Sequence, residues 1–225
     1  MKLKVCGMRD PENIRALLEV SPDYMGFIFY EKSKRYVGPD FELPDELTDE
    51  RNAPLPQRVG VFVNHDQEYV LEQVHHYTLQ LVQLHGDESP AFCHDLRAEL
   101  DYEYAGESDS VKIIKAFPVN TAFGFQTLEP YQPYCDFFLF DAKTPQYGGS
   151  GQAFDWEILK AYPLATPIFI SGGIGPDNFQ DLLQFIRENQ LNVHAIDINS
   201  RFETAPGLKD IQAVAKVREA LFLHL

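Results

Sequence analysis

The chain has 225 residues, 44% of them hydrophobic, and a formal net charge of −15 at pH 7. This length suits one large domain or two small ones, with ample material for a core. Nucleic acid and anionic membranes would repel so acidic a surface, so we expect neither as a partner. A local basic pocket for a small phosphorylated ligand is still compatible with this charge.

The three cysteines, Cys6, Cys93 and Cys135, are too few and too scattered for a disulfide framework or a CxxC metal site. Such usage fits a reducing cytoplasm. The first five residues are strand-like, with no apolar signal core behind a basic head. No apolar run approaches the roughly 20 residues that a membrane helix needs. We therefore expect a cytoplasmic protein that does not cross a membrane.

Apolar segments predict eight strands. The run from Phe137 to Phe140 is continuous, which suits a strand buried on both faces of a parallel sheet. The other runs are short and are bounded by polar or glycine residues. The expected strands are residues 2–6, 24–30, 58–63, 79–84, 111–117, 137–140, 167–171 and 193–198.

Between the strands, apolar residues recur at helical spacing. Asp10 is expected to be an N-cap with Pro11 at the first helical position, and Ser89 to cap a later helix. Residues 38–57 are Pro-rich and acidic, and residues 101–109 are polar and predict a surface loop. The expected helices are one that begins at Pro11 and those at residues 45–51, 66–77, 89–100, 120–131, 155–161, 176–188 and 210–223.

Strands that alternate with helices indicate a parallel sheet, because each crossover helix returns the chain to the same edge. Eight such units in a chain of this length favour a closed (β/α)8 or TIM barrel over an open doubly wound sheet. No composition shift marks a boundary, so residues 1–225 are predicted to form a single α/β barrel domain.

In such a barrel the active site forms at the C-terminal ends of the strands. Asp141 directly follows the apolar run that ends at Phe140, and a loop with Gly148–Gly151 comes after it. We expect this loop to close over a substrate and exclude water. Cys6 ends the first strand, so the site is predicted to hold a thiol and a carboxylate from different strands.

The turns after the last two strands resemble a phosphate site. Gly172 and Gly173 follow the seventh strand, and Asn199 and Ser200 follow the eighth. They offer backbone N–H groups and a hydroxyl, and a short helical turn near Arg201 can aim its positive end at the same point. Together they predict a small phosphorylated ligand.

With these motifs the chain resembles the phosphoribosylanthranilate isomerase family of tryptophan biosynthesis. The resemblance implies a (β/α)8 barrel and an Amadori rearrangement of N-(5′-phosphoribosyl)anthranilate to 1-(2-carboxyphenylamino)-1-deoxyribulose 5-phosphate. The matching segments run the length of the chain in order. They are Lys4–Arg9, Gly26–Phe29, Ser33–Val37, Val59–Asn64, Leu81–Asp87, Phe140–Asp141, Gly148–Gly151, Phe154–Trp156, Ser171–Ile174, Asp197–Ser200 and Pro206–Asp210.

The resemblance also implies roles for single residues. Asp141 matches the general acid of the family, which opens the ribose ring, and Cys6 matches the general base, which removes the proton from C2′. Arg35 matches the arginine that meets the anthranilate carboxylate, for which a planar guanidinium is well shaped. His85 is expected to line the anthranilate pocket. No metal or organic cofactor is implied.

The physical requirements of these roles differ. An acid that works near neutral pH needs a raised carboxyl pKa, whereas a thiol base needs a shift toward thiolate. Lys4 lies two residues before Cys6, so both side chains point to the same side of the strand. We hypothesise that Lys4 helps to hold the Cys6 thiolate; the alternative is that Lys4 only pairs with Asp197 in the barrel interior.

Two other classes of function compete with the isomerase. Another phosphate-binding barrel enzyme, such as indole-glycerol-phosphate synthase or the sugar isomerase of the histidine pathway, would need a Lys/Glu set or paired aspartates at these strand ends. A catalytically silent barrel that acts as a binding subunit would be favoured by loss of Cys6 or Asp141, and both are present. Arg201 departs from the small residue that the family often has there. We expect a monomer, with a dimer as the alternative.

Overall fold

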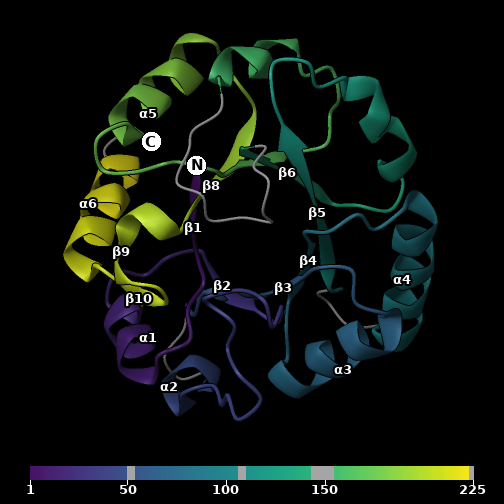
Figure 1. The fold of residues 1–225 in the computed structure, drawn as a ribbon, viewed down its shortest axis with the longest axis vertical. Coiled ribbons are helices and arrows are strands. Elements are labelled where there is room, and N and C mark those ends of the chain that lie inside the picture. Colours follow the sequence, from purple (N-terminus) through teal and green to yellow (C-terminus); the bar gives the residue numbers. More distant parts are fainter. Residues whose placement is uncertain (50–53, 106–109, 143–154, 223–225) are drawn as a thin grey trace.

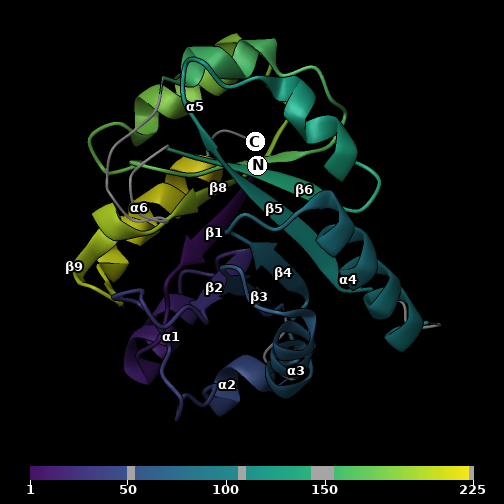
Figure 2. The same ribbon diagram turned by 45° about the vertical axis from the view of Figure 1, so that its right-hand side comes forward.

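Eight parallel strands close into a barrel and follow one another around it in chain order. The computed structural model describes residues 1–49, 54–105, 110–142 and 155–222. Figure 1 shows the strands at the centre with the helices around them, and Figure 2 shows the tilt of the strands. The predicted (β/α)8 fold is confirmed. The strands are β1 (Lys2–Cys6), β2 (Tyr24–Ile28), β3 (Gln57–Phe62), β4 (Leu81–Leu84), β5 (Lys112–Val119), β6 (Phe137–Ala142), β7 (Ile168–Ile170) and β8 (Val193–Ile198).

Helices connect most of these strands, and their start signals act as expected. Asp10 Oδ1 accepts a hydrogen bond from the backbone N–H of Asn13 at 2.8 Å, and Ser89 Oγ accepts one from that of Phe92 at 3.2 Å. Each cap satisfies an N–H group that the first helical turn leaves without a partner. The α-helices are α1 (Pro11–Leu18), α2 (Asp45–Thr48), α3 (Gln67–Tyr77), α4 (Pro90–Glu103), α5 (Phe179–Glu188) and α6 (Ile211–Phe222).

The crossovers after β5 and β6 differ from the prediction. They contain 3₁₀ helices, η2 (Phe125–Tyr131) and η3 (Trp156–Ala161), where full helices were expected. In η2, Pro130 lacks an N–H group and cannot continue a regular helical ladder. The predicted loop at 101–109 is also partly wrong, because α4 continues to Glu103; residues 106–109 lie outside the described residues.

The end of β8 leads into a small hairpin. A 3₁₀ turn, η4 (Ser200–Phe202), is followed by β9 (Glu203–Ala205) and β10 (Leu208–Lys209), which pair antiparallel. The helical turn expected near Arg201 is therefore present. Figure 1 shows the hairpin at the outer side of the barrel, next to α1 and α6.

The barrel interior changes character along its axis. Toward the N-terminal ends of the strands, inward-facing side chains form a closed apolar cluster, and every second residue along each strand continues this inner column. Leu139 is thus followed by Asp141, Leu81 by Gln83, and Ala195 by Asp197. The interior therefore becomes polar at the C-terminal ends. The apolar cluster consists of Tyr24, Val59, Leu81, Ile114, Ala116, Phe137, Leu139, Phe169 and Ala195.

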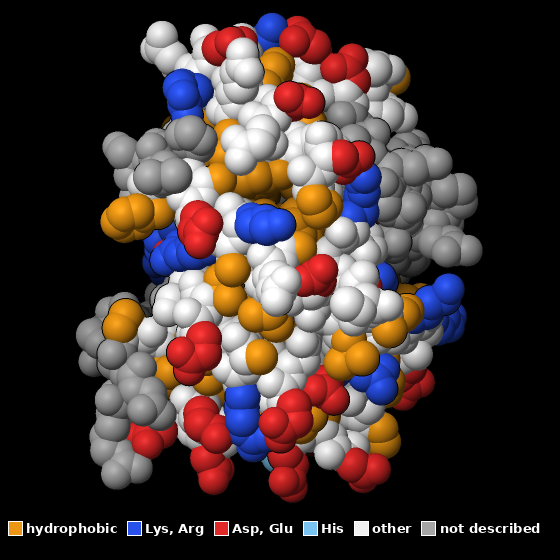
Figure 3. All heavy atoms as spheres, turned by 90° about the vertical axis from the view of Figure 1, so that its left-hand side faces the viewer, with side chains coloured by type: hydrophobic (Ala, Val, Ile, Leu, Met, Phe, Trp, Pro, Cys, Tyr) orange, Lys and Arg blue, Asp and Glu red, His pale blue; other side chains and the backbone are white. Residues whose placement is uncertain are grey.

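The surface is mixed in charge. The face in Figure 3 shows acidic and basic side chains interspersed, with acidic ones gathered at its lower end. Within the described ranges, no helix combines the length and the apolar character that a bilayer crossing requires.

Candidate active site

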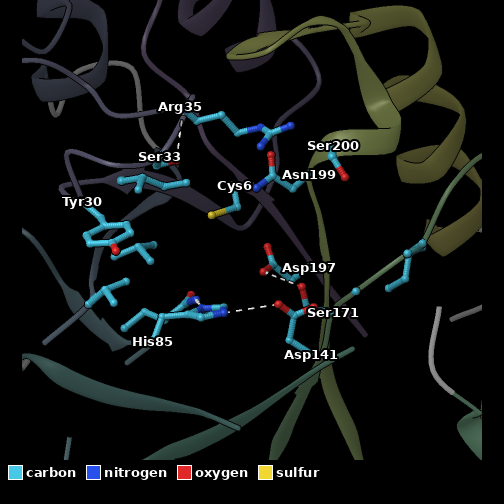
Figure 4. A pocket seen from close by; sticks show the side chains of 17 residues that line it. Cys6, Tyr30, Ser33, Arg35, His85, Asp141, Ser171, Asp197, Asn199 and Ser200 are labelled. Atoms are coloured by element: carbon cyan, nitrogen blue, oxygen red, sulfur yellow. Dashed lines mark hydrogen bonds and ion pairs between the residues drawn. The ribbon is translucent and has the colours of Figure 1, made fainter. Parts of the chain in front are cut away.

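A pocket opens among the C-terminal ends of the strands, as the fold predicts (Figure 4). Strands or loops from both halves of the chain contribute to its wall. The lining residues are Cys6, Ile28, Tyr30, Ser33, Arg35, Val61, Val63, Gln83, His85, Asp141, Ser171, Gly172, Gly173, Ile174, Asp197, Asn199 and Ser200.

The wall has an apolar side and a polar side. Ile28, Val61 and Val63 come from β2, β3 and the residue after β3, and Tyr30 lies beside them. Figure 4 shows Tyr30 on one side of the cavity and Ser171, Asn199 and Ser200 on the other, with the Cys6 thiol between them. An elongated ligand with an aromatic end and an anionic end would match this division.

Asp141 lies inside β6 rather than just beyond it, because β6 continues to Ala142. Its Oδ1 accepts a hydrogen bond from the N–H of Ala142 at 2.9 Å, and its Oδ2 lies 3.3 Å from Nε2 of His85. On the far side of the imidazole, Nε2 of Gln83 lies 2.7 Å from Nδ1 of His85. The carboxylate, the imidazole and the amide thus form a chain of contacts along the pocket wall.

Cys6 faces the pocket from β1. It pairs with Gly26 of β2, where a Cβ atom would lie 2.8 Å from the Cys6 sulfur, so the glycine leaves room for the thiol. Burial raises the pKa of Cys6, and the charge of Asp197 adds to this rise, while Lys4 and Lys209 pull it down. The expected net shift toward thiolate is not found; burial outweighs the two lysines.

Lys4 is fully buried and does not line the pocket. Its Nζ forms an ion pair with Oδ1 of Asp197 at 3.0 Å, and Ser171 Oγ donates to Oδ2 of the same carboxylate at 3.2 Å. The pair joins β1 to β8, where Lys4 and Asp197 lie in register. The expected pairing with Asp197 is thus present, and the charge of Lys4 also lowers the pKa of Cys6.

Arg35 reaches the pocket from the loop after β2, and its backbone N–H donates to Ser33 Oγ at 3.1 Å. Its guanidinium forms a forked ion pair with Glu203 of β9, the shortest contact being Nη2 to Oε2 at 2.6 Å. Lys209 of β10 donates to Glu203 Oε1 at 2.6 Å and to Asn199 Oδ1 at 2.8 Å.

The turns predicted to bind phosphate lie together in the wall. Gly172 and Gly173 have φ values of +81° and +66°, a backbone region that favours glycine. A Cβ atom on Gly172 would lie 2.5 Å from Oδ1 of Asp141, so this turn packs directly against the carboxylate. Arg201 does not line the pocket; it donates to the carbonyl of Gly173 at 2.9 Å and pairs with exposed Asp177.

Sequence reasoning did not single out Gln83 as a pocket residue, and it named Asp197 only as a partner of Lys4. Gln83 and Asp197 face inward because they continue the alternation of β4 and β8, and that alternation is the signal that points to them. Lys115, in an otherwise apolar strand, is a second signal: its Nζ lies 3.1 Å from Oε2 of Glu88, and both side chains are almost fully buried. Glu88 also accepts hydrogen bonds from the backbone N–H groups of Asn64 and Gly86. These bonds hold the loop that carries His85.

Other expectations meet the limits of the described residues. The Gly148–Gly151 loop and Phe154 lie outside them. Among the residues that are described, no group of three or more His, Cys, Asp and Glu side chains could hold a metal ion.

The chain matches known proteins over nearly its whole length. The model of the N-(5′-phosphoribosyl)anthranilate isomerase family matches residues 3–220. The N-(5′-phosphoribosyl)anthranilate isomerase of Parabacteroides distasonis is 42% identical over 212 residues, which are 94% of this chain and 89% of the relative. That of Phocaeicola vulgatus is 43% identical over 216 residues, 95% of this chain and 94% of the relative.

Solved structures agree. The phosphoribosyl anthranilate isomerase of Thermotoga maritima superposes with a TM-score of 0.75 and 32% identity, covering 100% of both chains. A second structure from that organism is of monomers generated from the isomerase, which its description calls dimeric. A third isomerase, solved with reduced 1-(o-carboxyphenylamino)-1-deoxyribulose 5-phosphate, has a TM-score of 0.69 and 26% identity, covering 97% of each chain.

A family model that spans the barrel and relatives that are similar from end to end point to one assignment. The chain belongs to the N-(5′-phosphoribosyl)anthranilate isomerase family and is an enzyme of the isomerase class.

Proposed function

We propose that this chain converts N-(5′-phosphoribosyl)anthranilate to 1-(2-carboxyphenylamino)-1-deoxyribulose 5-phosphate, with Asp141 as general acid and Cys6 as general base. The observation that carries the proposal is that the Cys6 thiol and the Asp141 carboxylate, from β1 and β6, face one pocket between an apolar wall and two glycine- and serine-containing turns. A solved relative binds a reduced form of this product, which supports the choice of substrate.

The division of the pocket suggests how the substrate lies. The phosphate would meet the backbone N–H groups of Gly172 and Gly173 and the end of β8 at Asn199 and Ser200, all of which line the pocket. The anthranilate ring would lie against the apolar wall, with its carboxylate toward Arg35. The ribose then lies between Cys6 and Asp141.

The reaction can then be written as two paired proton transfers. Protonated Asp141 donates to the ring oxygen as the C1′–O bond breaks, and the amine nitrogen forms a protonated imine. Cys6, as thiolate, removes the proton from C2′, and the electron pair shifts to give an enolamine. Return of that proton from Cys6 to C1′ and transfer of the C2′ hydroxyl proton to Asp141 yield the ketone and restore both groups.

We further propose that Lys4 supports the thiolate. Its ammonium is one of the two positive charges that lower the pKa of Cys6 against the effect of burial. The ion pair with Asp197 fixes its position inside the barrel. Substrate that covers the pocket would not disturb Lys4, because it lies behind the wall rather than in it.

The test is turnover of freshly made phosphoribosylanthranilate, followed by loss of its anthranilate-type fluorescence. Wild type should turn it over, and Cys6→Ala and Asp141→Asn should each reduce kcat by several orders of magnitude without loss of the fold. No turnover by a folded wild type would overturn the isomerase proposal and favour another phosphate-binding barrel or a silent binding subunit. Activity retained in Cys6→Ala alone would assign the base elsewhere.

We also propose that the protein acts as a monomer in the cytoplasm. The three cysteines are free, as expected for a chain that keeps its thiols reduced. Light scattering after gel filtration tests the oligomeric state: a mass near 25.7 kDa supports a monomer, and twice that mass would align this chain with the dimeric relative.

A further inference from the structure

Glu203 binds one edge of the Arg35 guanidinium. Nε of Arg35 lies 2.8 Å from Oε1 and 3.0 Å from Oε2 of Glu203, and Nη2 lies 2.6 Å from Oε2. No described residue bonds to Nη1. The Arg35 side chain is 13% exposed and Glu203 only 4%, so the pair is buried except for the part of Arg35 that lines the pocket. Glu203 thus holds the edge of the guanidinium formed by Nε and Nη2, and the Nη1 edge is available to a ligand.

The hairpin determines where Glu203 lies. Lys209 lies opposite Glu203 in the β9–β10 pairing, and its Nζ contacts Glu203 Oε1 at 2.6 Å. The N–H of Gly207, in the turn between the two strands, donates to the same oxygen at 3.1 Å. These contacts leave the Glu203 carboxylate no other orientation in which its partners are satisfied.

The hairpin is in turn tied to the barrel. The side-chain amide of Asn13 in α1 donates to the carbonyl of Lys209 at 3.0 Å and accepts from its N–H at 2.7 Å. Arg35 is held from below as well, because a Cβ atom on Gly7 would lie 2.7 Å from Cδ of Arg35. Gly7 follows Cys6, so the position of Arg35 is fixed relative to the thiol.

The cluster of Arg35, Glu203 and Lys209 keeps a surplus positive charge. With Lys209 protonated, two cations and one anion leave +1 beside the pocket; burial lowers the pKa of Lys209, and the charge of Glu203 opposes this lowering. Burial opposes ionisation of Glu203, but Arg35 and Lys209 outweigh it and hold the pKa of Glu203 below its usual value. With Arg35 and Glu203 alone the cluster would be neutral, and Lys209 restores the attraction for an anion.

We infer that Glu203 is a positioning residue for substrate selectivity: it orients Arg35 so that the Nη1 edge binds a carboxylate on the aromatic ring, while Lys209 keeps the cluster cationic. This inference rests on the proposed function, and it concerns the step that separates an anthranilate from other phosphoribosyl arylamines. Glu203 itself does not line the pocket.

The test compares two substrates, N-(5′-phosphoribosyl)anthranilate and N-(5′-phosphoribosyl)aniline, which lacks the carboxylate. Glu203→Gln keeps the size of the side chain and removes its charge. We expect it to lower kcat/KM for the anthranilate substrate roughly tenfold through KM, with kcat little changed, because a carboxylate contact is made equally in ground and transition states. For the aniline substrate, kcat/KM of the variant should equal that of wild type.

Two further variants show that Glu203 acts through Arg35. Arg35→Met should abolish the preference for the anthranilate substrate, and adding Glu203→Gln to it should change the preference no further. Glu203→Asp should recover part of the selectivity. Affinities for the reduced product with and without its carboxylate give the same comparison by calorimetry, and thermal unfolding reports on the fold of each variant.

Several outcomes would overturn the inference. An equal loss of kcat/KM for both substrates in Glu203→Gln would show that Glu203 merely maintains the structure. A gain in the preference on Glu203→Gln would show that Glu203 competes with the substrate carboxylate for Arg35. Additive effects of the two substitutions would separate Glu203 from Arg35. A wild type that turns over neither substrate contradicts the proposed function instead, and the calorimetric comparison then still tests the positioning role.

Discussion

The Nε2 atom of His85 lies 3.3 Å from Oδ2 of Asp141, so the residue after β4 and the carboxylate of β6 meet across the pocket. An amide nitrogen can only donate, and Nε2 of Gln83 lies 2.7 Å from Nδ1 of His85. In this orientation of the Gln83 amide Nδ1 carries the lone pair, and Nε2, on the side of Asp141, carries the proton. A donor here stabilises the carboxylate that remains after Asp141 has given up its proton.

The first prediction concerns His85→Leu. The substitution removes the close polar contact with Asp141, and an interaction of a polar group with a charged group is worth about 1.5–3 kcal/mol, so kcat should fall roughly ten- to a hundredfold. KM should change little. His94→Leu is the control, because His94 also contacts an aspartate, Asp95, but on the exposed surface. Stopped-flow or steady-state fluorescence gives kcat, and an unchanged kcat in His85→Leu would remove His85 from the acid step.

The second prediction concerns the tautomer of His85. Gln83→Glu replaces an amide donor by a carboxylate acceptor, so Nδ1 should become protonated. Nitrogen NMR of labelled His85 should show protonated Nε2 in wild type and protonated Nδ1 in the variant. Gln83→Met, which neither donates nor accepts strongly, is the matched control for the size of the side chain. Protonated Nδ1 in wild type would reverse the assignment.

The third prediction concerns Gly172→Ala. A Cβ atom there would lie 2.4 Å from the backbone nitrogen of Ala142, and the positive φ of +81° adds about 1–3 kcal/mol of strain. We expect a rise in KM and a fall in kcat together, because the turn touches Asp141. Gly38→Ala is the control: its φ is +95°, but a Cβ atom would have nothing within 4 Å.

In Gly38→Ala the backbone strain should lower the midpoint of thermal unfolding while kcat and KM keep their wild-type values. Comparison of the two variants separates strain from contact with the site. Equal kinetic constants in Gly172→Ala and wild type would show that the turn and the carboxylate are independent.

The fourth prediction concerns the thiol. Lys4→Met should raise the pKa of Cys6 further and slow its alkylation at a fixed pH, since one of the two favourable charges is removed. Asp197 would then be a buried charge without its partner, a change that costs about 3–5 kcal/mol and threatens the fold. Lys4→Met/Asp197→Asn removes both charges and should shift the pKa less, because Asp197 acts in the opposite direction.

Alkylation of the Cys6 peptide, followed by mass spectrometry across a pH series, separates Cys6 from the two core thiols. A thiol titration that is identical in wild type and Lys4→Met would rule out the electrostatic role of Lys4. The pairing with Asp197 would then be its whole function.

The fifth prediction concerns acid stability. Burial lowers the pKa of His194 to about 4, and the nearby positive charges of Lys2 and Lys112 contribute. The unfolded chain, with an ordinary histidine pKa of about 6.5, binds more protons than the folded chain between these values. Stability contributed by neutral His194 is therefore lost as pH falls from about 6.5 to about 4. The free energy of unfolding of His194→Gln should fall less steeply than that of wild type over this pH range.

Urea unfolding at a series of pH values measures this difference. The same change at exposed His76 separates loss of any histidine from loss of the half-buried one at the bottom of the barrel. Equal slopes for wild type and His194→Gln would contradict the shift.

Most of the fold could be predicted from sequence because its signals are local. Alternation and apolar runs marked the eight strands, and Asp10 and Ser89 marked two helix starts. The 3₁₀ crossovers were not predicted, because apolar spacing alone does not distinguish η2 from an α-helix. The strand was predicted to end at Phe140, because the charge of Asp141 ends the apolar run, yet the register with Pro118 continues the strand through Asp141.

The partners within the site were less predictable. Arg35 was singled out, but Glu203 lies 168 residues later, and no local pattern joins them. Tertiary structure alone brings the hairpin against the loop after β2. Gln83 could have been found by following the alternation of β4 inward, while its contact with His85 depends on the side-chain positions of Gln83 and of the residue directly after the strand.

The ion pair of Lys4 and Asp197 has a consequence for how the enzyme is made. The two residues are 193 positions apart, on the first and the eighth strand of the barrel, so the ribosome delivers the ammonium long before the carboxylate. An ammonium without its partner costs several kcal/mol to desolvate, which keeps β1 from settling into an unfinished interior. The barrel therefore closes in the same event in which the two charges pair. That event also completes the surroundings of Cys6. The surroundings of Cys6 are therefore completed only after β8 has emerged from the ribosome.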